Sequence, residues 1–132
     1  MNENQLNVDG GLLEVCSLEP LTGFFRDGYT NTGAEDFGSH TVCAVVSKEF
    51  LDQQKAVGND LITPFPEFNF PGLKPGDRWA VCASRWQQAF ENGAACGVVL
   101  AATNVESLKF VDESALRAHA VDVPNDLSHL SD

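Results

Sequence analysis

One histidine, two cysteines and three aspartates are the side chains of this sequence that are best suited to catalysis. A thiol becomes a nucleophile when a neighbouring imidazole takes its proton, and a carboxylate can orient that imidazole or act as a general acid or base. The candidates for these roles are His40, Cys43, Cys82, Asp27, Asp36 and Asp60. If the protein is an enzyme, we expect its site to combine His40 with a carboxylate or a thiol.

Each of these residues also has a plainer explanation. Free cysteines are more often buried and inert than reactive, because a reactive thiol needs exposure and a stabilised thiolate. Asp60 follows an asparagine, and such a pair is typical of a turn. His40 and Cys43 are three residues apart, so on a regular strand their side chains point to opposite faces.

The cysteines are few and widely separated. They are Cys16, Cys43, Cys82 and Cys96, and no two form a C-x-x-C pair. We expect them to be reduced, because disulfides are rare in cytosolic proteins. A zinc site needs about four ligands at compact spacing, and we predict no metal site. The sequence names no cofactor, since it lacks the glycine-rich fingerprints of nucleotide binding.

Arginines and aspartates in glycine-rich segments suggest a site of a second kind. Arg26 and Asp27 are adjacent and precede Gly28. Such a pair either clamps a polar ligand or ties its own loop down, and the arginine fork suits an anion. The residues expected to contact a ligand are Arg26, Asp27, His40, Asp60, Arg78 and Arg85. We expect a small polar molecule between the loops 22–39 and 59–78.

Apolar runs and helix caps predict the elements that position these residues. Ser47 and Gly58 have the residue types of a helix start and a helix end. Ser84 and Thr103 each precede a Gln or Glu by three residues, as in a capping box. The expected strands are 7–15, in one piece or two, 40–46, 77–83 and 97–102, and the expected helices are 48–57, 84–92, 103–108 and one that follows Asp112.

The strand at 77–83 alternates between two kinds of side chain. Trp79 and Val81 share one face, which we expect to pack in the core. Arg78 and Cys82 share the other, which either forms the floor of a cleft or is simply buried as well.

The order of elements predicts an α+β protein. We expect a two-layer sandwich with a roughly four-stranded sheet, helices mainly on one face, and two long ordered loops. A parallel α/β sheet is the alternative, because predicted strands and helices alternate. At 132 residues we expect one domain, with residues 1–7 and 124–132 as loose tails.

The charge balance argues against two classes of partner. Nineteen acidic and eight basic residues give a net charge of −11. Nucleic acids and anionic membranes both attract clustered Lys and Arg, so we expect neither as a partner. The polar N-terminal residues and the absence of a long apolar run predict a cytoplasmic protein. A homodimer through exposed loop phenylalanines is also compatible with the composition.

Several motifs together resemble a known family. They are Thr22-Gly23-Phe24-Phe25-Arg26-Asp27-Gly28, Thr32-Gly33 with Asp36, His40-Thr41-Val42-Cys43-Ala44, Gly58-Asn59-Asp60-Leu61, Phe70 to Trp79, and Arg85-Trp86. From about Val8 to Val121 the chain resembles the domain of unknown function 2237 family. The resemblance implies a compact α+β two-layer fold and no established activity. Many relatives have cysteine where this chain has Thr30 and Ala80, which counts against an essential thiol or metal.

Three functions follow from these observations. The first is a small cytosolic protein that binds a polar ligand between the two loops. The second is a small enzyme that uses His40 with a carboxylate or thiol, and the third is a structural or oligomerisation module. The enzyme requires His40 to lie within hydrogen-bonding distance of a carboxylate or thiol in an open cleft.

Overall fold

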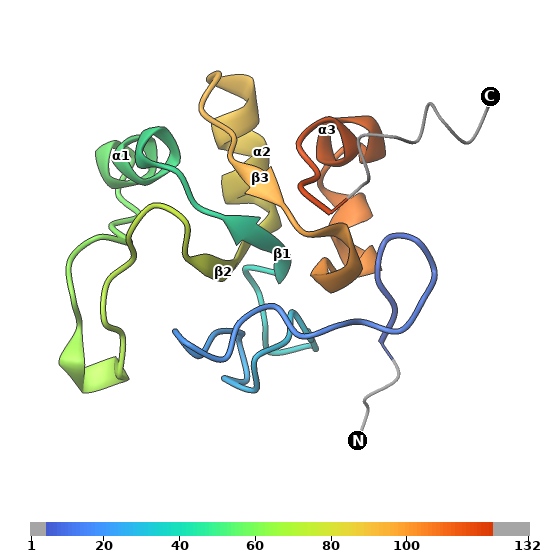
Figure 1. Cartoon of the computed structure of the whole chain (residues 1–132), viewed down its shortest axis with the longest axis horizontal. Helices are drawn as coiled ribbons and strands as arrows, with labels where there is room; N and C mark the ends of the chain where they lie inside the picture. Colours follow the sequence, from blue (N-terminus) through green and yellow to red (C-terminus); the bar gives the residue numbers. More distant parts are fainter. Residues whose placement is uncertain (1–4, 123–132) are drawn as a thin grey trace.

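The computed structural model describes residues 5–122, in which short strands and helices are joined by long irregular segments (Figure 1). The strands are β1 (His40–Val45), β2 (Arg78–Cys82) and β3 (Gly97–Val98). The α-helices are α1 (Lys48–Ala56), α2 (Ala83–Glu91) and α3 (Glu113–Ala118). The 3₁₀ helices are η1 (Pro66–Phe68), η2 (Leu100–Ala102) and η3 (Val105–Lys109). Among these helices, none has the length and apolar composition needed to cross a membrane.

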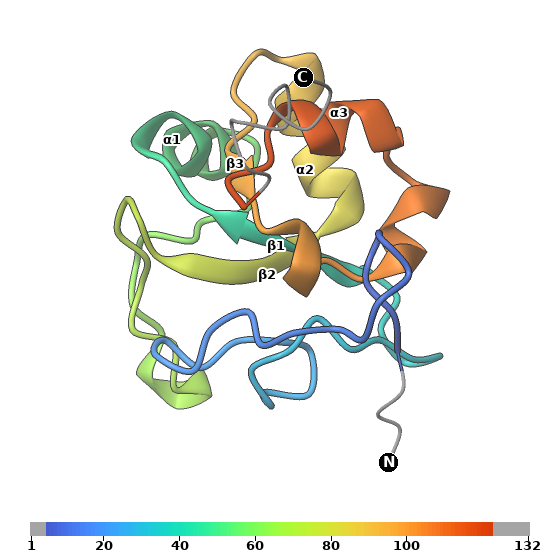
Figure 2. The same cartoon turned by 45° about the vertical axis from the view of Figure 1, so that its right-hand side comes forward.

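The sheet is antiparallel, with β1 between β2 and β3. The expected α+β class is confirmed, whereas the parallel α/β alternative is wrong. The expected four strands are not found among the described residues, where the sheet has three. The expected two-layer sandwich is not confirmed either. The three α-helices lie on one side of the sheet, and the irregular chain that precedes β1 runs along the other side (Figure 2).

Two predicted strands are shorter or absent because their backbone groups bond elsewhere. Residues 7–15 contribute only isolated bridges, such as that between Asn7 and Asn104. The strand predicted at 97–102 ends at Val98. The amides of Leu100 and Ala101 donate to the carboxylate of Asp122, at 2.8 and 3.0 Å, so they are not available to a neighbouring strand.

Two of the four expected helix starts are confirmed, at Ser47 and at Asp112, which is the N-cap residue of α3. Ser47 caps α1 by accepting a hydrogen bond from the Phe50 amide. The cap expected at Ser84 is wrong, because α2 begins directly after β2 and its N-cap residue is Cys82. The cap expected at Thr103 is also wrong, because Asn104 caps the 3₁₀ helix η3 instead.

The main core lies between the sheet and the helices. One face of β1 and β2 contributes Val42, Ala44, Trp79 and Val81 to it. Phe50 of α1, Trp86 of α2 and Leu116 of α3 are fully buried against this face. The prediction that the Trp79 face of β2 packs in the core is therefore confirmed.

A disulfide fixes the irregular layer to the opposite face of the sheet. Cys16 and Cys43 are bonded, with their Cα atoms 5.7 Å apart. Val99 and Ala102 pack around the disulfide. The expectation of four reduced cysteines is therefore wrong. The pairing joins residues 27 positions apart, which no local cysteine motif reveals.

The expected N-terminal tail is partly wrong. Gln5 exchanges two hydrogen bonds with the backbone of Thr32, each 3.0 Å long. Asn7 is buried and its side chain donates to two backbone carbonyls. The remaining expected tail residues, 1–4 and 124–132, lie outside the described part of the chain.

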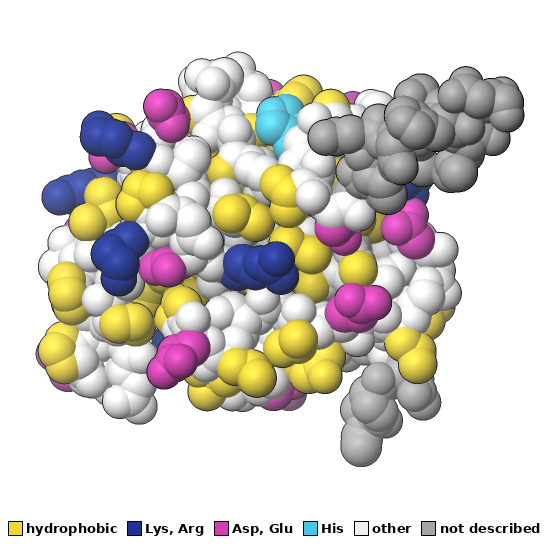
Figure 3. Space-filling model, viewed as in Figure 1, with side chains coloured by type: hydrophobic (Ala, Val, Ile, Leu, Met, Phe, Trp, Pro, Cys, Tyr) yellow, Lys and Arg dark blue, Asp and Glu magenta, His cyan; other side chains and the backbone are white. Residues whose placement is uncertain are grey.

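The surface carries hydrophobic side chains at many separate places. Figure 3 shows them interspersed with acidic and basic groups on one face of the molecule. Several loop phenylalanines are among them, and Phe37 is the most exposed, at 94%.

Candidate functional site

The structure brings three of the six candidate catalytic residues into one chain of contacts. The Nδ1 atom of His40 lies 2.6 Å from Oδ1 of Asp36. The Nε2 atom of the same ring lies 3.4 Å from Sγ of Cys82. A carboxylate, an imidazole and a thiol therefore stand in the order that nucleophilic catalysis uses, with the base between its orienting group and the nucleophile.

A change of register in the sheet places the imidazole beside the thiol. Cys43 pairs with Ala80, and Val42 pairs with Val81. The register then shifts by one residue, so that His40 rather than Thr41 is opposite Cys82. Such a β-bulge reverses the face that the following side chain occupies. The prediction that His40 and Cys43 point to opposite faces is therefore wrong.

The loop before β1 fixes Asp36 behind the imidazole. Its side chain is fully buried, and Oδ2 accepts hydrogen bonds from the His40 amide and from Oγ1 of Thr32, both at 2.9 Å. Ser39 adopts a left-handed conformation, with φ of 51°, at the end of this turn. Its carbonyl accepts from the amides of Thr41 and Ala83, which ties the turn to both β1 and α2.

Cys82 occupies the junction between β2 and α2. It is the last residue of the strand and the N-cap of the helix. The first-turn amides of a helix point toward its N-terminus, where they favour negative charge. The loop packs tightly over this sulfur, because a Cβ atom on Gly38 would lie 2.9 Å from Sγ of Cys82 and 3.2 Å from Cε1 of His40. Alanine therefore does not fit at Gly38 without displacing the pair.

His40 is a strong base in this setting. Its hydrogen bond to Cys82, and a second one to Asp36, raise the pKa of the imidazole from 6.5 to about 9, although burial acts in the opposite direction. The ring is therefore a cation at neutral pH, and both ring nitrogens donate hydrogen bonds. Phe24 stacks against the ring with centroids 5.9 Å apart. About a third of the His40 side chain, 35%, remains exposed to solvent.

One small cavity opens beside the thiol, and a larger cavity lies next to the small one. The small one, of about 60 Å³, is lined by His40 and Cys82 together with Asn59. The larger one, of about 250 Å³, lies between the loops 22–39 and 59–78, where its walls are Arg26, Asp60, Leu61, Phe65, Phe68, Phe70 and Trp79. Leu61 and Trp79 line both cavities, so the two are neighbours. We call the larger one the aromatic groove.

Two of the predicted ligand contacts lie on the aromatic groove. The guanidinium of Arg26 lies over the ring of Trp79, 5.3 Å from its centroid. Asp60 accepts three hydrogen bonds, from the amides of Ile62 and Thr63 and from Oγ1 of Thr63. These bonds, that of the Thr63 hydroxyl foremost, lower the pKa of the Asp60 carboxyl. Asp60 thus forms the turn that the sequence suggests, at the edge of the groove.

Other predicted contacts lie apart from the cavities beside Cys82. Asp27 accepts hydrogen bonds from the Tyr29 amide and from Asn31, so it holds its own loop together. Arg85 donates to Gln88, one turn further along α2. Arg78 is exposed at the start of β2, and neither it nor Arg85 lines the aromatic groove.

Cys43 is excluded as a nucleophile because its sulfur is bonded to Cys16. The free cysteines of residues 5–122 are Cys82 and Cys96. Burial raises the pKa of the Cys96 thiol to about 12. Among the same residues, no three His, Cys, Asp or Glu side chains gather as a metal site would require.

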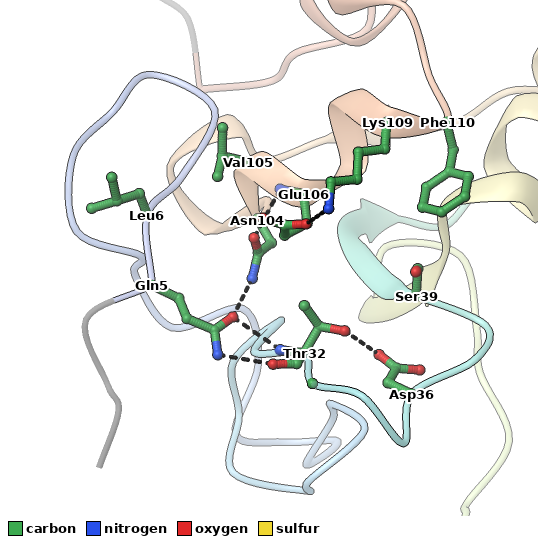
Figure 4. Close-up of a pocket in the computed structure, with 11 residues that line it drawn as sticks. Gln5, Leu6, Thr32, Asp36, Ser39, Asn104, Val105, Glu106, Lys109 and Phe110 are labelled. Carbon is green, nitrogen blue, oxygen red and sulfur yellow. Dashed lines mark hydrogen bonds and ion pairs between the residues drawn. The ribbon is translucent and has the colours of Figure 1, made fainter.

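A further cavity of about 590 Å³ lies next to Asp36 but is lined by neither His40 nor Cys82. Figure 4 shows the N-terminal segment, the loop before β1 and η3 around it. Its polar groups bond to one another: Asn104 donates to Gln5, and Lys109 is paired with Glu106. This lining leaves few polar groups free to select a ligand.

Three residues that contribute to the site are not among the site candidates named from the sequence. Asn59 lines the cavity at Cys82, Thr32 binds the Asp36 carboxylate, and Gly38 allows the loop to approach the sulfur. Asn59 was recognised only as half of an Asn-Asp turn pair. A polar residue on the inner face of α1, Gln54, is a signal that could have indicated its neighbourhood.

Comparisons with known proteins give a family but no activity. A search of curated proteins found no match. A family model described as an uncharacterised protein conserved in bacteria matches residues 6–120. This range contains every residue of the site described above. The chain therefore belongs to the domain of unknown function 2237 family, as the motifs in its sequence indicated.

Proposed function

We propose that the protein is an enzyme that uses the Cys82 thiol as a nucleophile. His40 acts as its acid and base, and Asp36 orients the imidazole. The observation that carries the proposal is the unbroken line of contacts from the buried Asp36 carboxylate through His40 to the sulfur. A purely structural histidine does not need a free, partly exposed thiol on one side and a buried carboxylate on the other.

The chemistry that best fits this arrangement is acyl transfer or hydrolysis. A neighbouring imidazolium stabilises a thiolate, which is the attacking form of cysteine. The sulfur attacks a carbonyl carbon, the C–S bond forms, and the leaving group departs with the proton of the His40 Nε2 atom. Water then attacks the thioester and gives a proton to His40, and the sulfur leaves as a thiolate, which releases the acid and restores the thiolate–imidazolium pair.

The aromatic groove is the natural site for the rest of the substrate. It lies between the two loops that the sequence suggested for a polar ligand, and it shares the walls Leu61 and Trp79 with the small cavity at Cys82. Its aromatic walls favour an apolar group, and Arg26 favours an anionic one. We infer a small substrate that carries both, with its carbonyl directed at the thiol.

Selective alkylation of Cys82 tests the proposal. At about pH 6.5 iodoacetamide should modify Cys82 rapidly and Cys96 very slowly, since the Cys96 thiol is buried. In His40→Gln the rate at Cys82 should fall towards that of an ordinary thiol, of which about 1% is ionised at this pH. Asp36→Asn should give an intermediate rate. Peptide mapping by mass spectrometry assigns each modification, with Cys82→Ser as the control.

A matched pair of glycine variants separates the contact from general effects of the loop. Gly38→Ala places a methyl group against Cys82 and His40, whereas Gly33→Ala makes only ordinary contacts, of 3.5 Å or more. The first should slow alkylation of Cys82 and the second should not. If the His40→Gln variant is alkylated as fast as the parent protein, the proposed enzyme is wrong.

A further inference from the structure

Asn59 borders the space in which Cys82 would attack a substrate. It lines the small cavity together with His40 and Cys82. Its side-chain amide has two N–H groups, and one of them donates to Oε1 of Gln54 at 2.8 Å. The other makes no hydrogen bond within the described residues. A donor beside a nucleophile can stabilise the negative oxygen that forms during acyl transfer.

The end of helix α1 fixes the backbone of Asn59. The amide of Gly58 donates to Lys55 and the amide of Asn59 donates to Gln54, which is the double hydrogen bond of a Schellman motif. Gly58 adopts a φ of 97°, and no atom lies within 4 Å of the position a Cβ would take. Glycine is therefore required here for the conformation rather than for space. The motif therefore fixes the position of the Asn59 backbone beside the cavity.

The side chain of Asn59 is oriented by a fully buried glutamine. Gln54 lies on the inner face of α1, with 0% of its surface exposed. Its Nε2 atom donates to the carbonyl of Arg85 at 3.5 Å and to Oε1 of Gln53 at 2.7 Å. A backbone carbonyl only accepts, so the Gln54 oxygen must face Asn59, and Asn59 must present its NH₂ group.

A glutamine is unexpected at this buried position of α1. The neighbouring inward residues of α1, Phe50 and Leu51, are apolar. A buried amide costs free energy unless it is fully hydrogen-bonded, and an apolar residue has no such cost. Gln54 spans from α2 to Asn59, so its polar groups serve to hold the Asn59 amide in one orientation.

We propose that Asn59 is a catalytic residue whose amide donates to the oxyanion of the tetrahedral intermediate, and that Gln54 is its positioning residue. This inference rests on the proposed function, because it requires attack by Cys82. When the C–S bond forms, the carbonyl electron pair moves to the oxygen, which accepts the free N–H of Asn59. When the pair returns, the leaving group departs with the proton from His40.

Two reactions of the Cys82 thiol distinguish an oxyanion-binding role of Asn59 from an effect of Asn59 on the thiol itself. Acylation by 4-nitrophenyl acetate passes through an oxyanion, and its release of nitrophenol is followed by absorbance. Alkylation by iodoacetamide is a direct displacement and forms no oxyanion. In Asn59→Ala the acylation rate should fall by about 10², the usual loss for one oxyanion donor, while alkylation is unchanged. Asn92→Ala, which removes a comparable amide at the end of α2, should change neither rate.

The outcomes of these experiments distinguish the oxyanion role of Asn59 from the proposed enzymatic function of Cys82. If alkylation of the parent protein depends on His40 but Asn59→Ala acylates normally, the oxyanion role is wrong and the proposed enzyme stands. Equal loss of both reactions in Asn59→Ala also overturns the role, since it indicates a disturbed thiol. If alkylation is insensitive to His40, both proposals fail together.

The positioning role of Gln54 has its own test. Gln54→Met keeps the volume of the side chain but removes the acceptor for Asn59. Acylation should fall while alkylation stays unchanged, and circular dichroism should show the helices intact. In the double variant with Asn59→Ala, the methionine should cause no further loss of acylation. A further loss would mean that Gln54 does not act through Asn59.

Discussion

His40 lies between a buried carboxylate and a partly exposed sulfur, and both contacts favour its cation. The energetic consequence extends beyond reactivity, because a pKa that differs between the folded and unfolded chain links stability to pH. The hydrogen bond to Cys82 is the largest cause of the shift from 6.5 to about 9. Solvent reaches about a third of the side chain, which moderates the gain.

The first prediction concerns stability against pH. Because the folded pKa of His40 is raised, its stabilising effect is fully present below about pH 6.5 and is lost as the pH rises through about 9. Urea unfolding of the parent protein and His40→Gln should therefore differ more near pH 6 than near pH 10. A difference that grows towards high pH would contradict the assignment of the cation to His40.

The sequence could name Asp36, His40 and Cys82 because their side chains have the required chemistry. It could not select them from the six candidates, because the selection depends on a single extra residue in β1. That bulge at Thr41 moves His40 to the side of Cys82. Neither the composition of the chain nor the alternation of its side chains indicates a bulge. The same is true of the disulfide partner of Cys43, which no sequence motif reveals.

The helices and strands were easiest to predict where local sequence signals agree with the long-range contacts of the folded chain. The helix α1 has its cap, its apolar face and its glycine end, and all three are found. Thr103 looks like a helix cap, yet its hydroxyl donates to Val99 and accepts from the amide of Cys43. The side chain of Thr103, which fits a local capping motif, thus bonds instead to a strand residue 60 positions away.

The second prediction concerns this buried threonine. In Thr103→Val the shape is kept, but the buried amide of Cys43 loses its acceptor. An unsatisfied buried donor costs about 1–3 kcal/mol, so the free energy of unfolding should fall by that amount in urea titration. Thr63→Val, which removes an exposed hydroxyl bonded to Asp60, is the control and should cost much less. Equal losses in the two variants would show that the buried bond has no special value.

Across the molecule, a layer of irregular chain covers the face of the sheet opposite the helices. The α+β class was predictable from the order of elements, but this layer was not, because it has almost no regular structure of its own. It is held by the Cys16–Cys43 disulfide and by side-chain contacts such as that from Thr22 to the Ala80 amide. The disulfide also overturns the expectation of reduced cysteines, which was drawn from an expected cytoplasmic location.

The third prediction concerns the disulfide. The bond closes a loop of 27 residues, and the chain-entropy model gives about 3.5 kcal/mol for a loop of this length. The double variant Cys16→Ser, Cys43→Ser should be less stable than the parent by about this amount in urea titration. The parent protein with reductant should behave like the variant, whereas Cys82→Ser should keep its response to reductant. A parent protein whose stability ignores reductant would indicate that the bond does not form in solution.

The direct passage from β2 into α2 has a consequence for how the site can change over time. Cys82 belongs to both elements, and no connecting residue separates them. The Cys82 sulfur therefore has no hinge, and an insertion or deletion at this junction would shift either the strand or the helix out of the core. Most residues that line the aromatic groove lie on loops, which tolerate substitution and changes of length. Under the proposed function, selection for new substrates can thus act on the walls while the position of the sulfur stays the same.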